Sequence, residues 1–449
     1  MVDAIRYDRP LRYGENGSRR RVLYISYDGV LEPLGESQVV AYLERLTDAA
    51  AITLMSFEKR ADLAESSRVT AMSARLDRAG ITWIRRPYHK RPPIASTAFD
   101  IASGCLAARR WATPFVGADL RVRPGADTSV GPYTEGFESI SPYAGPLIVH
   151  ARGYVPAMIA LHVKRHAGAR FVFDMRGFWV DEKVDAGQWP PNGMLYRIGK
   201  RYERRFLAAA DAVVSLTAAG VRELPRLGPV RQGAPVVVIP NCADLDRFAP
   251  GPPCDRLRST LGLDGAFVAG YVGTLSNWYL RDETLLYFAF LARRFDRMKA
   301  LFVTREDHGR LRTDAARAGL PADRLVLTRA SFDEMPALMR LMQVGVFFIR
   351  VCFSKRASAA TKLAEFLGCG VPVVINDGIG DSGELVRDGR VGVVLDDTTA
   401  QQFEESAATL ERLLADPSTA ERCREVAMRR FNLTTGVASY RSLYERLAG

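Results

Sequence analysis

Residues 358–372 read S-A-A-T-K-L-A-E-F-L-G-C-G-V-P, a turn, an amphipathic helix and a buried strand in succession. A helix that begins here leaves the N–H groups of Ala360, Thr361 and Lys362 without intrahelical partners, beside the positive end of the helix dipole. Such a helix start binds anions, phosphate among them. Glu365 lies one turn further on, where its carboxylate can accept hydrogen bonds from two hydroxyl groups. A phosphate and a vicinal diol describe a nucleotide, so the stretch predicts a nucleotide-phosphate site.

The other residues of this stretch predict how the helix packs. Leu363, Phe366 and Leu367 fall on one helical face and should point into a core. Gly370 and the proline two residues later end the helix. Residues 371–375 are then apolar on both sides of a strand, which is typical of a parallel sheet covered on both faces.

Short apolar runs alternate with amphipathic segments along the whole chain, and this alternation predicts right-handed βαβ units with parallel strands. The first series of predicted strands is 22–26, 52–56, 81–84, 147–150, 171–174, 212–216 and 236–239. The second series is 267–272, 301–304, 325–328, 344–349, 371–375 and 391–395. A chain of 449 residues is too long for one ordinary core, so we expect two domains of about 200 residues each.

The expected domain boundary lies in a proline-rich segment. Residues 241–253 contain three prolines near their end and suit a linker. We therefore assign 19–240 to an N-terminal domain, 254–433 to a C-terminal domain and 434–449 to a final helix. Residues 1–18 are expected to be disordered, and residues 120–146, rich in Gly, Pro and Ser, to form a long loop. Ligands of such sheets bind at the carboxyl ends of the strands, so the cleft between the domains is the expected site.

Composition and missing motifs narrow the function. No predicted strand is followed by G-x-G-x-x-G and no P-loop motif occurs, which argues against dinucleotide and Walker-type nucleotide binding. The six cysteines are scattered without metal-ligand spacing and indicate a reducing compartment. No stretch of 18 apolar residues and no secretory signal is present. We expect a soluble or peripheral protein of the cytoplasm with no bound metal.

The positive charge is concentrated in the first half of the chain. The net charge is +11; residues 1–240 hold 34 Lys and Arg against 24 Asp and Glu, and the remainder holds 28 against 27. This asymmetry fits an anionic acceptor or an anionic membrane surface. A solvated basic surface is an equally good interpretation, because charge patterning alone is weak evidence.

Several motifs occur in the order found in one known family. They are Asp-Gly at 28–29, L-G-E-S-Q at 34–38, H-A-R-G-Y at 150–154, D-M-R-G-F-W at 174–179, I-P-N at 239–241, G-Y-V-G-T-L at 270–275 and the stretch at 358–372. With these motifs the chain resembles, over residues 20–445, the retaining nucleotide-sugar-dependent glycosyltransferases of the family 4 type. The resemblance implies the GT-B fold, two Rossmann-like domains facing across a cleft. The family has a Glu eight residues before Glu365, which usually contacts the donor sugar; here that residue is Ala357.

The resemblance implies a donor site in the C-terminal domain. Glu365 matches the glutamate that binds the nucleotide ribose. Thr361 and Lys362 are our first choices for the donor phosphates, since cations and helix N-termini must neutralise the leaving diphosphate where no metal does so. Arg350 and Lys355 are close in sequence and could reinforce them; a solvated loop is the alternative for Lys355.

A second phosphate-proximal turn is expected at the start of this domain. Gly273 would let the backbone approach a phosphate closely. Relatives often place an Arg and a Lys just after this glycine, but here only Arg281 could supply a cation. Trp278 and Tyr279 could line the sugar pocket or simply pack in the core.

Five residues of the N-terminal domain are candidates for the other side of the cleft. Gly35, at a helix start, would approach the donor sugar or the leaving phosphate, or serve only as a helix-entry glycine. Asp174 and Arg176 stand where many relatives have a histidine, and they could orient the acceptor or form an internal ion pair. His150 and Arg152, at the end of the preceding strand, are the remaining catalytic candidates.

The sequence therefore predicts a metal-independent glycosyltransferase that moves a sugar from a nucleoside-diphosphate-sugar to a hydroxyl acceptor, in polysaccharide, glycolipid or glycoconjugate biosynthesis. The absence of a Glu pair argues against double displacement, which needs a well-placed carboxylate nucleophile. The resemblance implies retention by front-face attack, assisted by the leaving phosphate. No cofactor is needed apart from the donor substrate. The alternatives are a sugar-nucleotide epimerase or phosphorylase of the same fold, or a basic protein that binds nucleic acid or a membrane surface. Nucleic acid is not expected, because aromatic residues are not interleaved with the basic ones.

Overall fold

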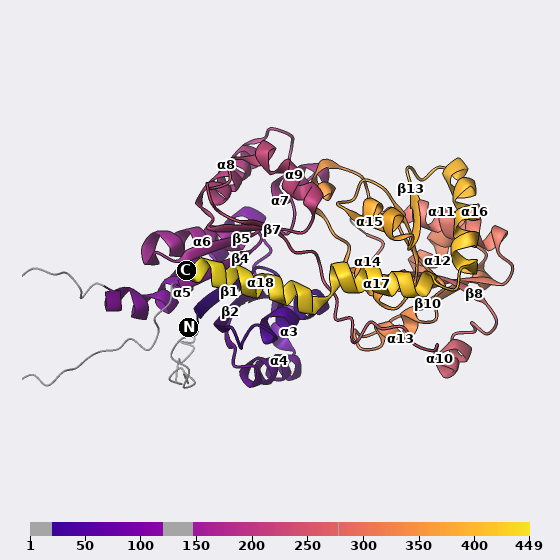
Figure 1. Cartoon of the computed structure of the whole chain (residues 1–449), viewed down its shortest axis with the longest axis horizontal. Helices are drawn as coiled ribbons and strands as arrows, with labels where there is room; N and C mark the ends of the chain where they lie inside the picture. Colours follow the sequence, from indigo (N-terminus) through magenta and orange to yellow (C-terminus); the bar gives the residue numbers. More distant parts are fainter. Residues whose placement is uncertain (1–19, 120–146, 277) are drawn as a thin grey trace, which may run out of the picture.

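Parallel strands form two separate sheets, one in each half of the chain (Figure 1). The structure is a computed structural model that describes residues 20–119, 147–276 and 278–449. The disorder predicted for 1–18 and the loop predicted for 120–146 lie outside the described residues. Every strand predicted from the two apolar series is present, and the predicted α/β architecture with two Rossmann-like domains is confirmed.

The first sheet has seven strands in the order β3-β2-β1-β4-β5-β6-β7. Its strands are β1 (Arg20–Ser26), β2 (Ala50–Glu58), β3 (Thr82–Pro87), β4 (Leu147–Arg152), β5 (Arg170–Asp174), β6 (Ala212–Ser215) and β7 (Val236–Val238). The register pairs Tyr24 with His150, and Arg152 with Asp174. Because all pairings are parallel, the polar residues that end β4 and β5 meet at one edge of the sheet.

Helices cover both faces of this sheet. The elements after β1 and β2 are α1 (Pro33–Gly35), the π-helix η1 (Glu36–Val40), α2 (Ala41–Glu44), α3 (Arg60–Ala64) and α4 (Ser66–Arg78). Those from β3 onward are α5 (Pro93–Asp119), α6 (Tyr154–Ala167), α7 (Trp179–Asp185), α8 (Met194–Ala209) and α9 (Ala218–Leu227). Residues of α5, α6, α8 and α9 form one buried cluster with the sheet, and those of η1, α2 and α4 form another on the opposite face.

The second sheet has six strands in the order β10-β9-β8-β11-β12-β13. Its strands are β8 (Phe267–Val272), β9 (Met298–Val303), β10 (Leu325–Thr328), β11 (Val344–Phe347), β12 (Val373–Asn376) and β13 (Gly392–Leu395). The helices are α10 (Asp255–Thr260), α11 (Arg281–Arg294), α12 (His308–Arg317), η2 (Ala322–Arg324), α13 (Met335–Met339), η3 (Phe353–Ala357), α14 (Thr361–Gly368), α15 (Ser382–Gly389), α16 (Ala400–Ala415) and α17 (Thr419–Phe431). Their buried side chains form one continuous core.

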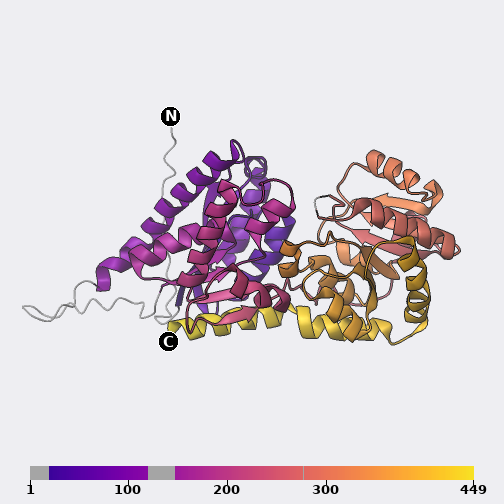
Figure 2. The same cartoon turned by 90° about the horizontal axis from the view of Figure 1, so that it is seen from above.

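The last helix, α18 (Leu433–Ala448), returns to the N-terminal domain. Figure 2 shows α17 and α18 running along one side of both domains, with the C-terminus beside the first. Val437, Tyr440 and Tyr444 of α18 join the cluster that contains Val22 and Tyr24 of β1. The final helix therefore covers part of one face of the first sheet.

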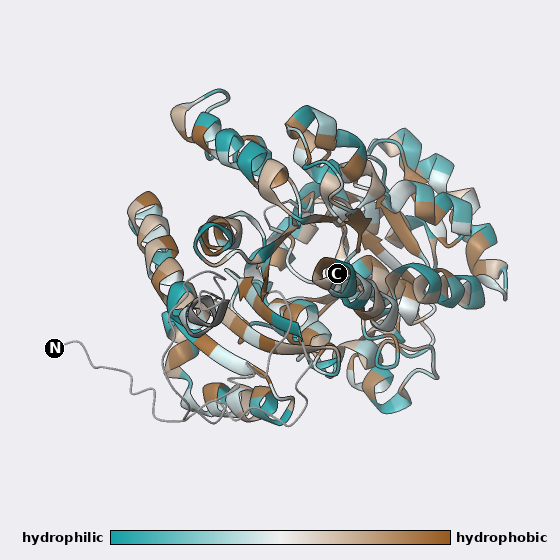
Figure 3. Cartoon of the chain, turned by 60° about the vertical axis from the view of Figure 1, so that its left-hand side comes forward, coloured by the Kyte–Doolittle hydropathy of each residue, from teal (hydrophilic) through white to brown (hydrophobic). Residues whose placement is uncertain are grey.

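Hydropathy follows this layering. In Figure 3 the strands are largely brown, and the surrounding helices carry most of the teal residues. Strands that are buried on both faces need apolar residues at successive positions, whereas a helix needs them on one side only.

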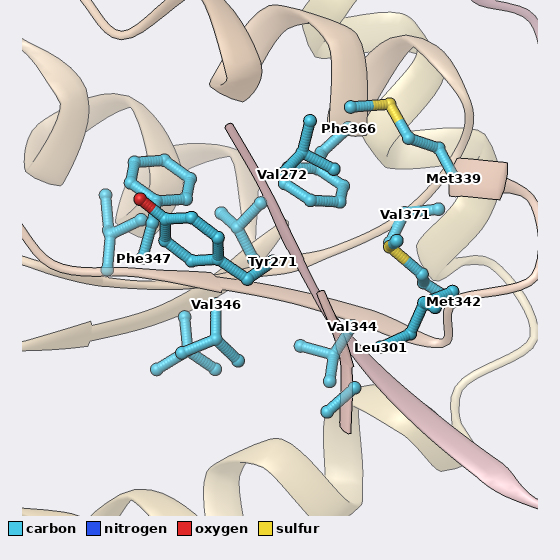
Figure 4. Packing of buried hydrophobic residues seen from close by; sticks show 14 of the residues in the cluster. Tyr271, Val272, Leu301, Met339, Met342, Val344, Val346, Phe347, Phe366 and Val371 are labelled. Atoms are coloured by element: carbon cyan, nitrogen blue, oxygen red, sulfur yellow. The ribbon is translucent and has the colours of Figure 1, made fainter. Parts of the chain in front are cut away.

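Close packing in the core of the second domain fixes the position of α14, the helix within residues 358–372 (Figure 4). The ring of Phe366 stacks on Phe347, and a Cβ on Gly345 would lie 2.8 Å from the Phe366 ring. A side chain larger than hydrogen at Gly345 would displace this ring, so glycine allows α14 to sit directly on β11. The helix start is consequently held at the carboxyl end of β11.

Candidate active site

The start of α14 presents uncapped N–H groups. Its N-cap residue is Ala360, which has no side-chain acceptor for the amides of the first turn. The Leu363 N–H bonds to the carbonyl of Ala360 (3.1 Å), which leaves the amides of Thr361 and Lys362 for a ligand or water. The helix lies within the stretch where the sequence predicted one, and the binding of a nucleotide phosphate at its start stays a prediction.

Lys362 is a buried cation below this helix start. Its exposed fraction is 7%, and its Nζ has no hydrogen-bond partner among the described residues. The Nζ lies 3.7 Å from the ring centre of Tyr279 and 4.2 Å from that of Tyr271. Burial lowers the pKa of its ammonium group to about 7, although the nearby Glu365 opposes this shift. A buried cation held only by ring faces is unusual and favours an anionic ligand.

Glu365 accompanies Lys362 one turn along α14. Burial raises the pKa of its carboxyl group to about 7, and Lys362 acts in the opposite direction. The side chain keeps partial exposure. Both groups therefore sit close to a change of protonation near neutral pH, which is common in binding and catalytic sites.

The structure brings Gly273 to Lys362, as predicted for two parts of one phosphate site. A Cβ on Gly273 would lie 3.4 Å from Lys362 Nζ, and the residue has φ +99°, a conformation that favours glycine. The Gly273 N–H is bonded to the carbonyl of Val303 (3.0 Å). What Gly273 supplies is therefore space beside the ammonium group, while its own amide is already used.

Arg281 points to carboxylates of its own domain. It donates to Asp314 (2.8 Å) and to Glu306, and Glu306 also accepts from the N–H of Leu275 (2.6 Å). This network fixes the turn after β8 and balances the charge of Arg281 internally. Glu306 and Asp314 had no signal in the sequence, because nothing in their spacing indicates a shared partner. The phosphate role of Arg281 stays a prediction.

Lys355 and Arg350 gather around one tryptophan. Lys355 Nζ lies 3.7 Å from the ring centre of Trp278, and the Arg350 guanidinium lies 6.0 Å from it. Lys355 is buried and forms an ion pair with Glu182 of α7 (3.0 Å). The solvated loop considered for Lys355 is therefore not what the structure shows; the side chain joins the two domains.

His150 and Asp174 lie in a buried polar network beneath α18. Asp174 Oδ2 accepts from the hydroxyl of Tyr440 (2.9 Å) and lies 3.4 Å from His150 Nε2. His150 Nδ1 lies 2.8 Å from the hydroxyl of Tyr444. Both side chains are fully buried. The spacing of Tyr440 and Tyr444, four residues apart on one helical face, is the only sequence signal for this contact.

Two arginines complete the network. Arg176 Nη1 lies 3.9 Å from Asp174 Oδ2, which is the internal ion pair considered from the sequence. Burial opposes ionisation of Asp174, but the charge of Arg176 and the hydrogen bond with His150 hold its carboxyl pKa below the usual range. Burial lowers the pKa of His150. Arg152 is also buried, with its Nε 3.9 Å from Asp28. Asp174 is thus the common partner of His150 and Arg176, and Arg152 lies opposite Asp174 in the strand register but pairs with Asp28.

One linker side chain contacts both domains. Asn241 accepts a hydrogen bond from Arg176 and donates one to the carbonyl of Ala359 (2.6 Å), two residues before α14. The Asp174 network is therefore connected to the helix that carries Lys362 and Glu365. The sequence marked residue 241 as the end of the I-P-N motif and the beginning of a linker, without indicating these two partners.

Gly35, the last residue of α1, packs tightly against the loop that follows β1. A Cβ there would lie 2.0 Å from the carbonyl oxygen of Gly29 and 2.8 Å from the Cα of Val30. The buried carboxylate of Glu58, at the end of β2, accepts from the N–H groups of Val30 (3.0 Å) and Leu31 (3.2 Å). Loop packing alone therefore requires glycine at 35, and its approach to the donor stays a prediction. Glu58 was not singled out by the sequence.

We expect Gly35→Ala to displace this loop, because backbone atoms cannot move aside as a flexible side chain can. The predicted result is a loss of stability of about 2 kcal/mol and a drop in kcat/KM of at least about tenfold. Thermal unfolding and steady-state kinetics measure both. Gly309→Ala is the matched control, since its Cβ would meet only Asp307 Oδ1 at 3.3 Å. Equal effects of the two substitutions would contradict the special role of the loop.

Two facing domains of parallel α/β type, with an uncapped helix start at a strand end of the second, have the architecture of the GT-B type. Residues 33–242 match the glycosyl transferase 4-like domain, and residues 255–430 match the glycosyl transferases group 1. The chain belongs to the group 1 glycosyltransferases, as the sequence motifs predicted.

Solved structures confirm the GT-B fold. A glycosyltransferase from Rickettsia africae ESF-5 is 14% identical with TM-score 0.66, covering 96% of this chain and 98% of that one. Sucrose-phosphate synthase from Thermosynechococcus elongatus is 15% identical with TM-score 0.64, covering 96% and 99%. Anabaena HepE in complex with UDP and glucose is 15% identical with TM-score 0.64, covering 95% and 100%. A search of curated proteins gives no significant match.

Proposed function

We propose that this glycosyltransferase uses a nucleoside-diphosphate-sugar as donor, a hydroxyl group as acceptor, and retains the anomeric configuration. The observation that carries the proposal is the pair of side chains on α14. Lys362 offers a buried positive charge without an acceptor, and Glu365 offers a carboxylate one turn away. A diphosphate and a ribose diol are the ligand groups that match this pair and the uncapped amides beside it.

In the proposed reaction the bond between the anomeric carbon and the diphosphate oxygen breaks, and the acceptor oxygen bonds to that carbon from the same face. The acceptor proton passes to the departing diphosphate. Lys362 and the first amides of α14 would stabilise the negative charge that develops on the leaving group. Arg350 and Lys355, held at Trp278, would add positive charge at the rim.

Similar folds support a nucleotide-sugar donor. Anabaena HepE has been solved with UDP and with UDP-glucose. A trehalose-6-phosphate synthase from Burkholderia multivorans has the same fold, at 13% identity and TM-score 0.62. The sugar itself is left open by this proposal, because Ala357 replaces the glutamate that usually contacts it in the family.

The acceptor belongs to the N-terminal domain in this proposal. Its excess of basic residues favours an anionic or lipid-linked acceptor, reached from the cytoplasmic face of a membrane. The six cysteines are free, which fits a reducing compartment. Along the described part of the chain, no helix has the length and apolar character needed to cross a bilayer.

The test is a calorimetric screen against UDP-, GDP-, dTDP- and ADP-sugars, followed by Glu365→Ala on the donor that binds. We expect the variant to raise the donor dissociation constant by about 10- to 100-fold, because the ribose hydroxyls lose a charged acceptor. Glu425→Ala, an exposed glutamate of α17, is the control. Unchanged affinity in Glu365→Ala would refute the ribose assignment.

Turnover assays separate the remaining alternatives. An epimerase would convert the donor without any acceptor, and a phosphorylase would require inorganic phosphate. Within the described residues, no three His, Cys, Asp or Glu side chains gather closely enough to hold a metal ion. Metal independence is part of the proposal, and loss of turnover in excess chelator that one divalent ion restores would refute it. NMR of the product's anomeric proton tests retention.

A further inference from the structure

The outer face of α8 combines exposed apolar side chains with arginines. Met194 and Ile198 are 73% and 46% exposed, far more than most apolar side chains of this size in the molecule. Arg197, Arg201 and Arg205 are exposed on the same side, since positions three and four apart share one helical face. We call these five residues the α8 outer face.

The opposite side of α8 is fixed in the core. Phe206 and Leu207 are buried among the helices and strands of the first domain. Glu203 is also buried, accepts from the hydroxyl of Tyr154 (2.6 Å) and pairs with Lys200. The helix therefore cannot rotate to hide Met194 and Ile198, and its only carboxylate faces inward.

Positive charge on this face is not balanced nearby. Residues 186–210 contain five basic residues, Arg197, Lys200, Arg201, Arg204 and Arg205, against the single acid Glu203. Lys200 pairs with Asp181 (2.8 Å) and Glu203, whereas none of the four arginines has an ion pair within the described parts of the chain. The guanidinium of Arg205 lies 5.5 Å from the ring centre of Tyr202.

The acidic residues of α7 are all engaged, Asp181 with Lys200 of α8 and the other two with the second domain. Glu182 of α7 pairs with Lys355, and Asp185 accepts from the N–H of Ser354 (2.9 Å), both toward the second domain. The segment joining α7 to α8 exposes Pro190 and Pro191. The α7–α8 pair thus has a basic and apolar outer side, and an acidic side that contacts the donor domain.

We propose that the α8 outer face docks on an anionic lipid bilayer, with Met194 and Ile198 entering the headgroup region and the arginines pairing with lipid phosphates. Exposed apolar residues flanked by arginines on one helical face are the pattern of interfacial helices. Charge complementarity selects an anionic surface over a neutral one. The inference rests on the proposed function in one respect, the lipid-linked acceptor. Docking through α8 would place the bilayer that holds this acceptor beside α7, which contacts the second domain.

A vesicle-binding experiment tests this docking with the full chain. Partitioning is measured on vesicles of phosphatidylcholine alone and of phosphatidylcholine with about one third phosphatidylserine. We expect binding to the anionic vesicles only, weakened by salt. Arg201→Gln with Arg205→Gln should weaken it roughly 10- to 30-fold, and Met194→Ser with Ile198→Ser should weaken it at least several-fold.

The control removes the same charge from the other domain. Arg429→Gln with Arg430→Gln, two exposed residues of α17, should leave partitioning within about twofold of the unmodified protein. Four results would each overturn the proposal. They are equal binding to both vesicle types, an equal loss of binding in the control, no loss of binding in either α8 double variant, and displacement of the protein from anionic vesicles by a single-stranded oligonucleotide.

A separate measurement of donor affinity distinguishes a failure of the docking proposal from a failure of the proposed function. Calorimetry without vesicles should give the same donor affinity for the unmodified protein and the α8 variants, because these residues lie outside the donor site. A protein that binds anionic vesicles through α8 but no nucleotide sugar would refute the proposed donor and leave the docking surface established.

Discussion

Lys362→Met should raise the dissociation constant of the nucleotide-sugar donor by about a hundredfold or more. The substitution keeps an unbranched apolar stem in the aromatic pocket and removes the buried ammonium group that we propose meets the diphosphate. A charge-assisted contact in a water-poor site contributes about 3 kcal/mol, which corresponds to this factor. Isothermal titration calorimetry with the donor found in the screen measures it.

The same substitution should make the unliganded protein more stable. An ammonium group without a hydrogen-bond acceptor is costly in the core, so its removal should raise the free energy of unfolding by about 2–4 kcal/mol. Opposite changes in affinity and stability are expected of a residue that serves a ligand. Lys90→Met, at an exposed lysine of the first domain, should change neither quantity by more than about 0.5 kcal/mol.

The pH dependence follows from the lowered pKa of Lys362. In the folded, unliganded protein this group loses its proton near pH 7, whereas in the unfolded chain it does so near its ordinary value of 10.5. The unfolded state therefore binds more protons between these values, and the destabilising effect of Lys362 is relieved as pH rises from 7. The unmodified protein should bind the donor more tightly than Lys362→Met. This difference in affinity should shrink as pH rises from 7, because the ammonium group loses its charge. A difference independent of pH would show that the ammonium group does not contact the donor.

The sequence predicted which residues gather at the start of α14 because they are local; their role in binding the donor stays a prediction. The amides of the α14 start, Lys362 and Glu365 lie within one and a half helical turns, so helix geometry alone relates them. Gly273 was placed near them by a general rule, since β8 and β11 are parallel neighbours and their carboxyl ends meet. The thirteen predicted strands rested on apolar runs, which parallel sheets require.

The sequence could not predict partners that come from distant elements. Arg281 meets Glu306 and Asp314 only because α11, α12 and the end of β9 pack together. His150 and Asp174 were expected to face the cleft as strand-end residues, but whether a strand-end side chain meets solvent depends on what covers that sheet face. Here α18 covers it, from almost 300 residues further along the chain.

The buried network and the donor helix form one connected structure. Asp174 meets Arg176, Arg176 donates to Asn241, and Asn241 holds the carbonyl just before α14. Arg176 has φ +57°, a left-handed conformation that is uncommon for a residue with a side chain and that marks a constrained position. A change at Asp174 should therefore act on both the stability of the first domain and the position of the donor helix.

Asp174→Asn should lower the free energy of unfolding by about 3–5 kcal/mol and reduce kcat/KM by at least about a hundredfold. The carboxylate is fully buried and is the counterion of Arg176, so its neutralisation leaves a guanidinium that is only 14% exposed without a balancing charge. The asparagine keeps the size of the side chain, which separates the loss of charge from the loss of packing. Chemical denaturation and steady-state kinetics measure the two effects.

One further variant, compared with Asp174→Asn, decides whether Asp174 acts on the substrate or on the protein. Tyr440→Phe removes one hydrogen bond to Asp174 without changing any charge and should cost about 1 kcal/mol of stability. If Asp174 only positions Arg176 and α14, the loss of activity across Tyr440→Phe and Asp174→Asn should scale with the rise in the donor dissociation constant. A fall in kcat at saturating donor, with donor affinity unchanged, would instead assign Asp174 a direct role at the reacting atoms.

Acid titration gives an independent readout of the same network. Burial lowers the folded-state pKa of His150 below its ordinary 6.5, so the unfolded state takes up a proton first and stability declines as pH falls below about 6.5. The pKa of Asp174 is also lowered, from 3.8, so its contribution is present above that value and is lost as pH falls through the folded-state pKa. His150→Asn should abolish the decline that this network contributes near pH 6 and leave the second, because the imidazole is the only group of the described network whose ordinary pKa lies near 6. A decline near pH 6.5 that persists in His150→Asn would show that another group causes it, and the buried imidazole would then have no part in the acid sensitivity of the domain.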